Sequence, residues 1–319
     1  MHCNWLAAGY SSEEGYDLLL LRMQTDSGDM EEICDMRLGS NPSFLCPGMN
    51  GIYAAEEYDS GASVLLVSVE CGRLYIERKI DVEGCFGLCH LAVYGDIVVG
   101  CCYGSGHVFA VDAMLTKVLW RRHNTARQRP LSHVHWSIRY DESTLCCADL
   151  GLDSLLLRSI SDGALQDTIP LEQGSGVRQI VLSTDKKLVY VVNESKSTLD
   201  VLALTGIPKL AASVRTTQSN LSNYPGAACL SREGILFVAN RGADTIAAFD
   251  MNSTEPRFMF ETGCGGTWPR WITLSEKEDF MICCNQKSGN VTSLRLSKGS
   301  LDVCGSVSLK NASCAVAAS

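Results

Sequence analysis

The feature that most constrains the fold of this chain is a repeat with a period of roughly 45 residues. Six segments share one layout of an opening residue, an apolar strand, a polar turn, a second apolar strand and a polar end, as in "GVRQIVLSTDKKLVYVVNE". Their equivalent opening positions are Ser43, Cys89, His135, Arg178, Gly226 and Arg270, which are 46, 46, 43, 48 and 44 residues apart. Helical spacing nowhere persists beyond about three turns, so the pattern predicts an all-β chain.

A period of about 40–50 residues with a hairpin in every repeat is typical of β-propeller blades, which have four strands each. A solenoid is the competing repeat architecture, but the strand content and the hairpins favour the propeller. The leading "WLAAGY" strand and the C-terminal "GSVSLKNASCAVAAS" could pair to close a seventh blade and remove the open sheet edges. The sequence therefore predicts a seven-bladed β-propeller of four antiparallel strands per blade, as a single domain over residues 1–319.

Composition narrows the class of partner. The net charge of −9 argues against nucleic acid or an anionic membrane surface as the main partner. The N-terminus shows no basic-then-apolar leader, and the "DLLLLRM" run is too short to span a bilayer, so we expect a cytoplasmic protein. The sixteen cysteines are scattered and form no CxxC pair, which favours reduced thiols in the core. No cofactor is expected, and the oligomeric state is open.

Six strings together identify a resemblance that covers nearly the whole chain. They are "NPSFL", "CHLAV…CCYGSGHVFAVD", "HVHWSIRYD…ADLGLDSL", "GSGVRQIVLS…VYVVNESKSTLDV", "LSREGILFVANRGADTIAAF" and "WPRWITLS…NQKSGNV". In this order they resemble the lactonase family of seven-bladed propellers, which includes propeller-type 6-phosphogluconolactonase and the 3-carboxy-cis,cis-muconate lactonising enzyme. The resemblance implies a catalytic site on the ring face where the opening residues gather.

The resemblance also implies roles for individual residues. The family's catalytic histidine matches His135, its two channel arginines match Arg178 and Arg270, and its glutamate matches Glu194. Glu57 also matches a family glutamate. The chain departs from the family pattern at three positions, where Cys229 replaces a histidine and Cys102 and Glu56 each replace an asparagine. These departures leave the four catalytic candidates intact and bear on the identity of the substrate.

The repeat supports part of this site without the resemblance. His135, Arg178 and Arg270 occupy one repeat position, so they should converge at one end of the channel. Two guanidiniums facing a cavity suit a carboxylate or phosphate, and a histidine with a carboxylate can act as general base and acid. Opening a lactone needs activated water and stabilisation of an oxyanion. The same four residues could also form a lactone from an alkene acid. The expected ligand is a small anionic lactone or a carboxylate.

Several residues have alternative interpretations. Either arginine could form a structural ion pair, and Glu194 could be a solvated turn residue. His133 and His135 could chelate a metal from one strand face, but no third ligand stands out, so no metal is predicted. Polar residues recur at the strand ends, where turn capping explains them as well as ligand binding does. The candidate substrate-binding residues are His133, Asp149, Asn193, Arg241, Asn285 and Glu57, and Asn240 shares the strand-end position.

The leading hypothesis is hydrolysis of a phosphorylated sugar lactone by His135, Glu194, Arg178 and Arg270. A carboxymuconate-type cyclisation is the alternative chemistry. A non-catalytic propeller that serves as a protein-interaction scaffold is the alternative from another class. A single pocket that holds the four residues would favour an enzyme over a scaffold.

Overall fold

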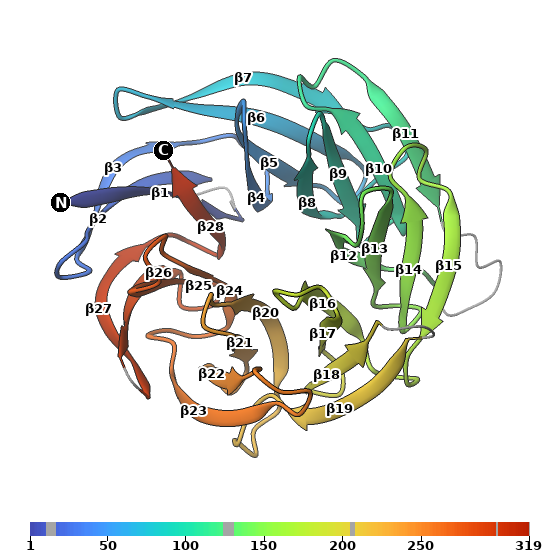
Figure 1. Cartoon of the computed structure of the whole chain (residues 1–319). Helices are drawn as coiled ribbons and strands as arrows, with labels where there is room; N and C mark the ends of the chain where they lie inside the picture. The colour runs from blue at the N-terminus through green and yellow to red at the C-terminus, as the bar shows by residue number, and fades with distance from the viewer. Residues whose placement is uncertain (11–16, 124–130, 205–207, 298, 319) are drawn as a thin grey trace.

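The strands of the protein form a closed ring of blades. The computed structural model describes residues 1–10, 17–123, 131–204, 208–297 and 299–318. Within these residues it contains 28 strands, which form seven four-stranded sheets around a central axis (Figure 1). The prediction of an all-β, seven-bladed propeller is therefore confirmed. None of the described residues belongs to a helix long and apolar enough to cross a membrane.

Each blade runs from an innermost strand at the axis to an outer strand at the perimeter (Figure 1). The innermost strands are β4 (Pro42–Gly48), β8 (Leu88–Tyr94), β12 (Val134–Arg139), β16 (Val177–Leu182), β20 (Tyr224–Leu230), β24 (Pro269–Leu274) and β28 (Ala312–Ala318). The second strands are β5 (Gly51–Glu57), β9 (Ile97–Cys102), β13 (Thr144–Asp149), β17 (Leu188–Asn193), β21 (Ile235–Arg241), β25 (Phe280–Asn285) and β1 (His2–Gly9).

The two outer layers of each blade follow the same order. The third strands are β6 (Ala62–Glu70), β10 (His107–Asp112), β14 (Ser154–Ser159), β18 (Thr198–Ala203), β22 (Thr245–Asp250), β26 (Asn290–Ser297) and β2 (Leu18–Gln24). The outer strands are β7 (Arg73–Asp81), β11 (Val118–His123), β15 (Leu165–Pro170), β19 (Lys209–Arg215), β23 (Arg257–Gly263), β27 (Ser300–Ser308) and β3 (Met30–Met36).

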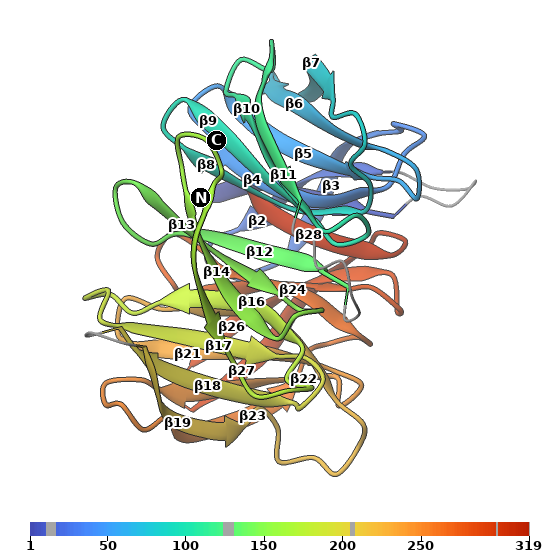
Figure 2. The same cartoon turned by 90° about the vertical axis from the view of Figure 1, so that its right-hand side faces the viewer.

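The two ends of the chain close the ring. The C-terminal strand β28 pairs antiparallel with the N-terminal strand β1, from Asn4 opposite Ala318 to Gly9 opposite Ala312. The termini lie in the same blade (Figure 1), and the marks for the two ends also lie close together in the view turned by 90° (Figure 2). The predicted pairing of the leading and trailing segments is confirmed, and it completes the seventh four-stranded blade of the ring.

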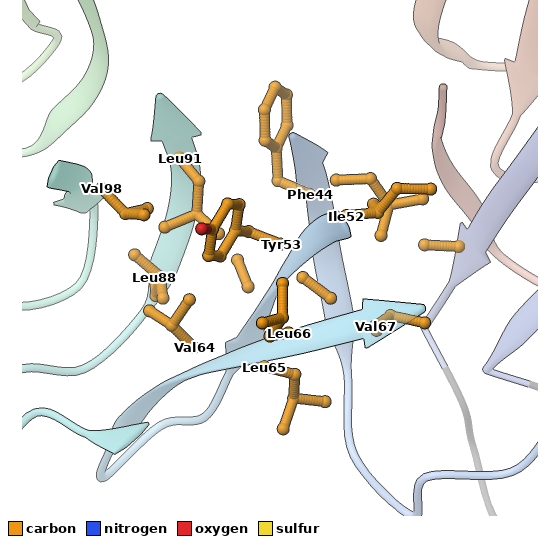
Figure 3. Close-up of a cluster of buried hydrophobic side chains, with 14 of the residues drawn as sticks. Phe44, Ile52, Tyr53, Val64, Leu65, Leu66, Val67, Leu88, Leu91 and Val98 are labelled. Atoms are coloured by element: carbon orange, nitrogen blue, oxygen red, sulfur yellow. The ribbon is translucent and has the colours of Figure 1, made fainter. Parts of the chain in front are cut away.

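The core lies between neighbouring blades. Second strands such as β13 and β25 are buried at every position, whereas the outer strand β15 is exposed at most positions. Figure 3 shows one interblade cluster, in which Tyr53 lies near Leu88 and Leu91. The Tyr53 hydroxyl donates to the carbonyl of Ala113 at 2.6 Å, so its one polar atom is satisfied. Ten of the sixteen cysteines are buried, as expected of small core residues.

A β-bulge interrupts every innermost strand near its first residue. The pairing register shifts between Pro42 and Phe44, Leu88 and His90, Val134 and Trp136, Val177 and Gln179, Pro225 and Ala228, and Pro269 and Trp271, and between Ala8 and Gly9 opposite β28. The residues without a register partner include Ser43, Cys89, His135, Arg178, Gly226, Arg270 and Ser313, and we call these seven the bulge ring. A bulge bends its strand and re-aims a side chain, so each blade turns one residue out of its ladder.

Two alanines of the closing strand provide a matched test of this packing. Ala315 is fully buried, whereas Ala317, two residues along β28, is exposed. We expect Ala315→Asp to lower the free energy of unfolding by about 3 kcal/mol or more, because it buries an unpaired carboxylate. Ala317→Asp should change it by no more than about 0.5 kcal/mol. Urea denaturation of both variants measures the difference, and equal losses would contradict the described closure.

Candidate active site

The bulge ring surrounds a narrow cavity on the propeller axis. The cavity measures about 20 Å³, which is room for about one water molecule. Its lining consists of Ser43, Phe44, Cys89, His135, Trp136, Arg178, Gln179, Gly226, Ala227, Arg270, Trp271 and Ser313. All seven bulge-ring residues belong to this lining. The structure therefore places His135, Arg178 and Arg270 together in one cavity, at the axis where β12, β16 and β24 approach one another (Figure 1).

Glu194, the fourth predicted catalytic residue, is not part of this lining but contacts Arg178, which is, and joins it to Arg241. Its Oε2 atom accepts from Arg178 Nη1 at 2.7 Å and from Arg241 Nη2 at 2.8 Å. The second nitrogen contact of each arginine is a backbone carbonyl: Arg178 Nε donates to Gly226 at 3.0 Å, and Arg241 Nε donates to Tyr224 at 2.7 Å. Both arginine side chains are buried, so Glu194 and the carbonyls fix their direction.

Gly226 makes the space that Arg241 occupies. A Cβ atom at this position would lie 3.0 Å from Arg241 Nε and 3.2 Å from the carbonyl oxygen of Pro269. The absence of a side chain at one place in the bulge ring therefore admits a guanidinium from the neighbouring strand β21. The side chain of Arg241, a predicted substrate-binding residue, therefore lies against Gly226 of the bulge ring.

Arg270 belongs to a second cluster on the other side of the cavity. Its Nη2 donates to the hydroxyl of Tyr10 at 2.6 Å, and that hydroxyl donates to Glu57 Oε2 at 2.6 Å. The Arg270 guanidinium also lies 5.0 Å from the centre of the Tyr10 ring. Glu57, predicted from the resemblance, therefore contacts the site through Tyr10.

Tyr10 is not among the residues predicted from the sequence. It follows the last residue of β1, just as Tyr103, Glu194 and Gln286 follow the ends of β9, β17 and β25. Aligning the closing blade with the other six would have placed Tyr10 at the same repeat position. That blade is assembled from both ends of the chain, and its repeat pattern is weaker. The equivalence of Tyr10 with Tyr103, Glu194 and Gln286 was therefore not recognised from the sequence.

Electrostatics divide the ionisable groups of the site into charged and neutral ones. Burial alone would raise the pKa of Glu194, but Arg178 and Arg241 outweigh it and hold that pKa below its usual value. Burial and the nearby Arg178 lower the pKa of Arg241 to about 9. Burial also acts to lower the pKa of Arg270, but Tyr10 and the acidic groups around it raise the pKa above its usual value. At neutral pH Glu194 is therefore an ionised acceptor.

His135 is the neutral member of the site. Burial, followed by the positive charges of Arg178, Arg270 and Arg241, lowers its pKa well below the usual value for histidine. Its Nδ1 is buried and has no hydrogen-bond partner among the described residues. A buried, unpaired imidazole nitrogen costs free energy, and such groups are expected at sites that bind a ligand or water.

Cys89 occupies the bulge ring but is not a nucleophile. Burial raises the pKa of its thiol to about 12. The thiol donates to the carbonyl of Cys101 at 3.4 Å and also lies 3.6 Å from the carbonyl of His135. A protonated thiol held by carbonyl oxygens is unreactive, because the thiolate is the attacking form.

The strand-end polar residues have structural partners. Asp149, Asn193, Asn240 and Asn285 all have zero exposure. Asp149 accepts from Ser132 Oγ and from three backbone N–H groups, those of His133, Gly151 and Leu152. Asn193 Nδ2 donates to Thr198 and Asp200, Asn240 Nδ2 donates to the carbonyl of Thr216, and Asn285 Nδ2 donates to Thr292. Of the two interpretations left open by the sequence, this geometry favours capping over substrate contact for Asp149, Asn193 and Asn285.

His133 is partly buried and is not part of the cavity lining. Its Nδ1 lies 2.8 Å from the carbonyl oxygen of Tyr103, and its ring stacks on Tyr103 with centroids 4.6 Å apart. Among the described residues, no group of three His, Cys, Asp or Glu side chains could hold a metal ion. The two cysteines at family-polar positions, Cys102 and Cys229, are also absent from the cavity lining.

The Arg178–Glu194–Arg241 cluster can be tested through stability. We expect Glu194→Gln to lower the free energy of unfolding at pH 7 by about 3 kcal/mol, because two buried guanidiniums then lose their counter-ion. Since the pKa of Glu194 is lowered by folding, its stabilising effect is present above pH 4.5, the unperturbed value, and is lost as the pH falls through the folded value.

Urea denaturation of wild type and Glu194→Gln at pH 7 and pH 3 measures this difference. The control is Glu31→Gln, which breaks the exposed pair with Arg22 and should change stability by less than about 1 kcal/mol at either pH. An equal loss in both variants, or a loss for Glu194→Gln that does not shrink in acid, would contradict the buried ionised cluster.

Comparison with known proteins places this geometry in a family. Residues 4–317 match the family described as "Lactonase, 7-bladed beta-propeller". The 6-phosphogluconolactonase of Bacillus subtilis is 27% identical over 279 residues, which are 79% of each chain. An uncharacterised protein of Lactococcus lactis subsp. cremoris is 23% identical over 308 residues, which are 90% of each chain.

Solved structures show the same fold. The periplasmic gluconolactonase of Pseudomonas aeruginosa superposes with a TM-score of 0.90 at 20% identity, covering 100% of this chain and 99% of that one. A putative 6-phosphogluconolactonase from Bacteroides fragilis gives a TM-score of 0.89 at 18% identity, covering 100% and 98%. Because the first of these is periplasmic, the expected cytoplasmic location stays a prediction. The match over almost the whole sequence establishes that this chain belongs to the lactonase family of seven-bladed β-propellers.

Proposed function

We propose that this protein hydrolyses an anionic sugar lactone, with 6-phosphogluconolactone as the leading candidate. The observation that carries the proposal is the presence of a neutral histidine in the same small cavity as two arginines. A neutral imidazole can accept a proton from water, and guanidiniums can stabilise the negative charge that develops on a carbonyl oxygen. The family relationship supports lactone chemistry, and the charge of the site supports an anionic substrate.

The local charge of the site opposes that of the whole protein. Three guanidiniums, from Arg178, Arg241 and Arg270, face the two carboxylates of Glu57 and Glu194, which leaves one positive charge in excess. The chain as a whole carries −9. An anionic lactone is therefore attracted to this mouth of the channel, and the planar guanidinium forks suit a phosphate or carboxylate.

The hydrolysis would proceed in two proton transfers. The lactone would lie at the mouth of the cavity, which itself has room for about one water molecule. Water attacks the lactone carbonyl carbon while the His135 imidazole takes one of its protons, and the guanidiniums of Arg178 and Arg270 stabilise the carbonyl oxygen. The tetrahedral intermediate then breaks its bond to the ring oxygen, which receives the proton back from His135. The product is the open hydroxy acid.

Binding of the substrate would also change the basicity of His135, the proposed general base. The low pKa of His135 arises partly from three nearby positive charges. A phosphate or carboxylate on these arginines offsets that charge, so substrate binding makes the imidazole more basic. In this scheme Glu194 is a positioning residue for Arg178 and Arg241, because an ionised carboxylate with a lowered pKa is a poor proton donor.

Steady-state hydrolysis of 6-phosphogluconolactone tests the proposal. We expect a wild-type rate far above the spontaneous one, and a fall in kcat of about 10²–10⁴-fold for His135→Gln, the usual range for loss of a general base. Arg270→Gln should reduce kcat/KM by at least about tenfold, through lost stabilisation of the oxyanion. The matched control is His107→Gln on β10, outside the cavity, which should leave both constants unchanged.

The unphosphorylated gluconolactone serves as the second substrate. The excess positive charge predicts a lower KM for the phosphorylated lactone, and the difference should narrow at high salt. Wild-type activity no better than the spontaneous rate on either lactone would overturn the proposed function. Full activity in both His135→Gln and Arg270→Gln would keep the function and reject this site.

A further inference from the structure

A second cavity lies at the opposite end of the same channel. It measures about 550 Å³ and is lined by the C-terminal parts of β4, β8, β12, β24 and β28, together with Trp5. The bulge ring lies near the N-terminal ends of these strands. The two cavities therefore open toward opposite faces of the propeller. The size is within the range of about 300–1,000 Å³ that small-molecule sites occupy.

Aromatic rings separate the two cavities. Phe44, Trp136 and Trp271 line both of them. The Phe44 ring meets Trp136 and Trp271 edge-on at centroid distances of 5.4 and 5.0 Å. His90 adds a fourth ring, 3.8 Å from Trp136 and 4.8 Å from Phe44. The second cavity thus has a floor of packed rings, on which a flat ligand can stack.

His90 supplies a donor beside the aromatic floor of this cavity, whose lining also holds Trp5 Nε1 and Ser137 Oγ, two buried atoms without a hydrogen-bond partner among the described residues. Its side chain is 3% exposed, and burial lowers its pKa to about 3, so the ring is neutral at physiological pH. The backbone N–H of Ser137 donates to His90 Nδ1 at 3.3 Å, which places the proton on Nε2. Nε2 has no hydrogen-bond partner within the part of the chain that the structure describes. The residue lines the second cavity and is absent from the lining of the first.

The rest of the lining excludes a charged ligand. Arg139 is the one ionised side chain among the described lining residues, which otherwise include aliphatic side chains such as Leu91, Val93 and Val316. Arg139 is exposed, and its guanidinium donates to the carbonyls of Asp141 and Glu142. A charged group placed among the aliphatic and aromatic side chains would lose its hydration without a counter-ion.

We propose that this cavity, on the face opposite the arginine site, binds a neutral, flat aromatic molecule with one hydrogen-bond acceptor. The ligand stacks against the floor formed by Trp136, Trp271 and Phe44, and its acceptor receives the Nε2–H of His90. The aliphatic side chains of β8 and β28 cover its edges. This site is independent of lactone hydrolysis, because its binding atoms lie on the far side of the aromatic floor.

Quinoline and naphthalene form a matched pair of probes. They have nearly the same shape, but only quinoline carries a ring nitrogen that accepts a hydrogen bond, and it is neutral at pH 8. We expect saturable quenching of tryptophan fluorescence by both probes, with quinoline bound about fivefold more tightly, the ratio that one neutral hydrogen bond supplies. Calorimetry confirms the affinities, and free N-acetyltryptophanamide corrects for direct quenching.

Three variants locate the binding. His90→Phe keeps a ring in the floor but removes the donor, so quinoline should lose its advantage and bind no more tightly than naphthalene. Ala92→Phe, on the partly buried lining of β8, should fill the cavity and weaken both probes at least tenfold. Ala317→Phe does the same from an exposed position on β28, which guards against misfolding of the first blocking variant.

The proposal is overturned by any of three results. These are the absence of saturable binding to the wild type, equal affinity of the wild type for both probes, or binding that survives in a folded blocking variant. Lactone hydrolysis by Ala317→Phe should match the wild type, since Ala317 lies outside the bulge-ring cavity. The binding results can be interpreted even if the proposed hydrolysis is not observed, because the binding assay measures tryptophan fluorescence and does not depend on lactone turnover.

Discussion

The site depends on one backbone device, the β-bulge that every innermost strand carries near its first residue. In an uninterrupted ladder, successive side chains would point alternately into the two neighbouring blades and none would face the channel. The bulge removes one residue from the ladder and turns it toward the axis. Repeated in seven blades, it assembles a ring of seven residues whose chemistry differs from blade to blade. The fold thus supplies the positions, and each blade supplies one group.

The electrostatic arrangement of the site follows from this ring. Histidine and two arginines occupy three of its positions, and glycine at a fourth admits Arg241 from the next strand. Each guanidinium has a fixed acidic or phenolic partner, Glu194 or Tyr10, so the positive charges are held in place without being neutralised as a group. Burial, reinforced by their combined field, keeps His135 uncharged. In the proposed function, the same three arginines would select an anionic substrate and influence the basicity of His135.

The repeat in the sequence was sufficient to predict the propeller, its closure, and the convergence of His135, Arg178 and Arg270. Periodicity reports on positions within a blade, and positions within a blade become positions around the ring. The bulges themselves carry no residue signature, since the displaced positions include serine, cysteine and glycine as well as charged residues. The sequence therefore indicated where the ring would form but not how a side chain leaves its strand to reach the channel.

Other parts of the site depend on contacts between distant segments. Tyr10 contacts Arg270, 260 residues away in the chain, through the blade that joins the two termini. The recurring Asp149, Asn193 and Asn285 looked equally suited to a ligand or to a cap, and only their complete burial distinguishes the two. The aromatic floor could not be predicted either, because Phe44, His90, Trp136 and Trp271 become neighbours only when four blades meet at the axis. The repeat can be recognised from the sequence, but the contacts between side chains of different blades cannot.

The central claim is that the bulge ring binds and opens an anionic lactone. A crystal structure of the protein with 6-phosphogluconate, the open-chain product of the leading substrate, tests it most directly. The account predicts the product carboxylate within about 3 Å of the guanidiniums of Arg178 and Arg270, with its carbon facing His135. Product bound elsewhere on the propeller, with these guanidiniums uncontacted, would contradict the account.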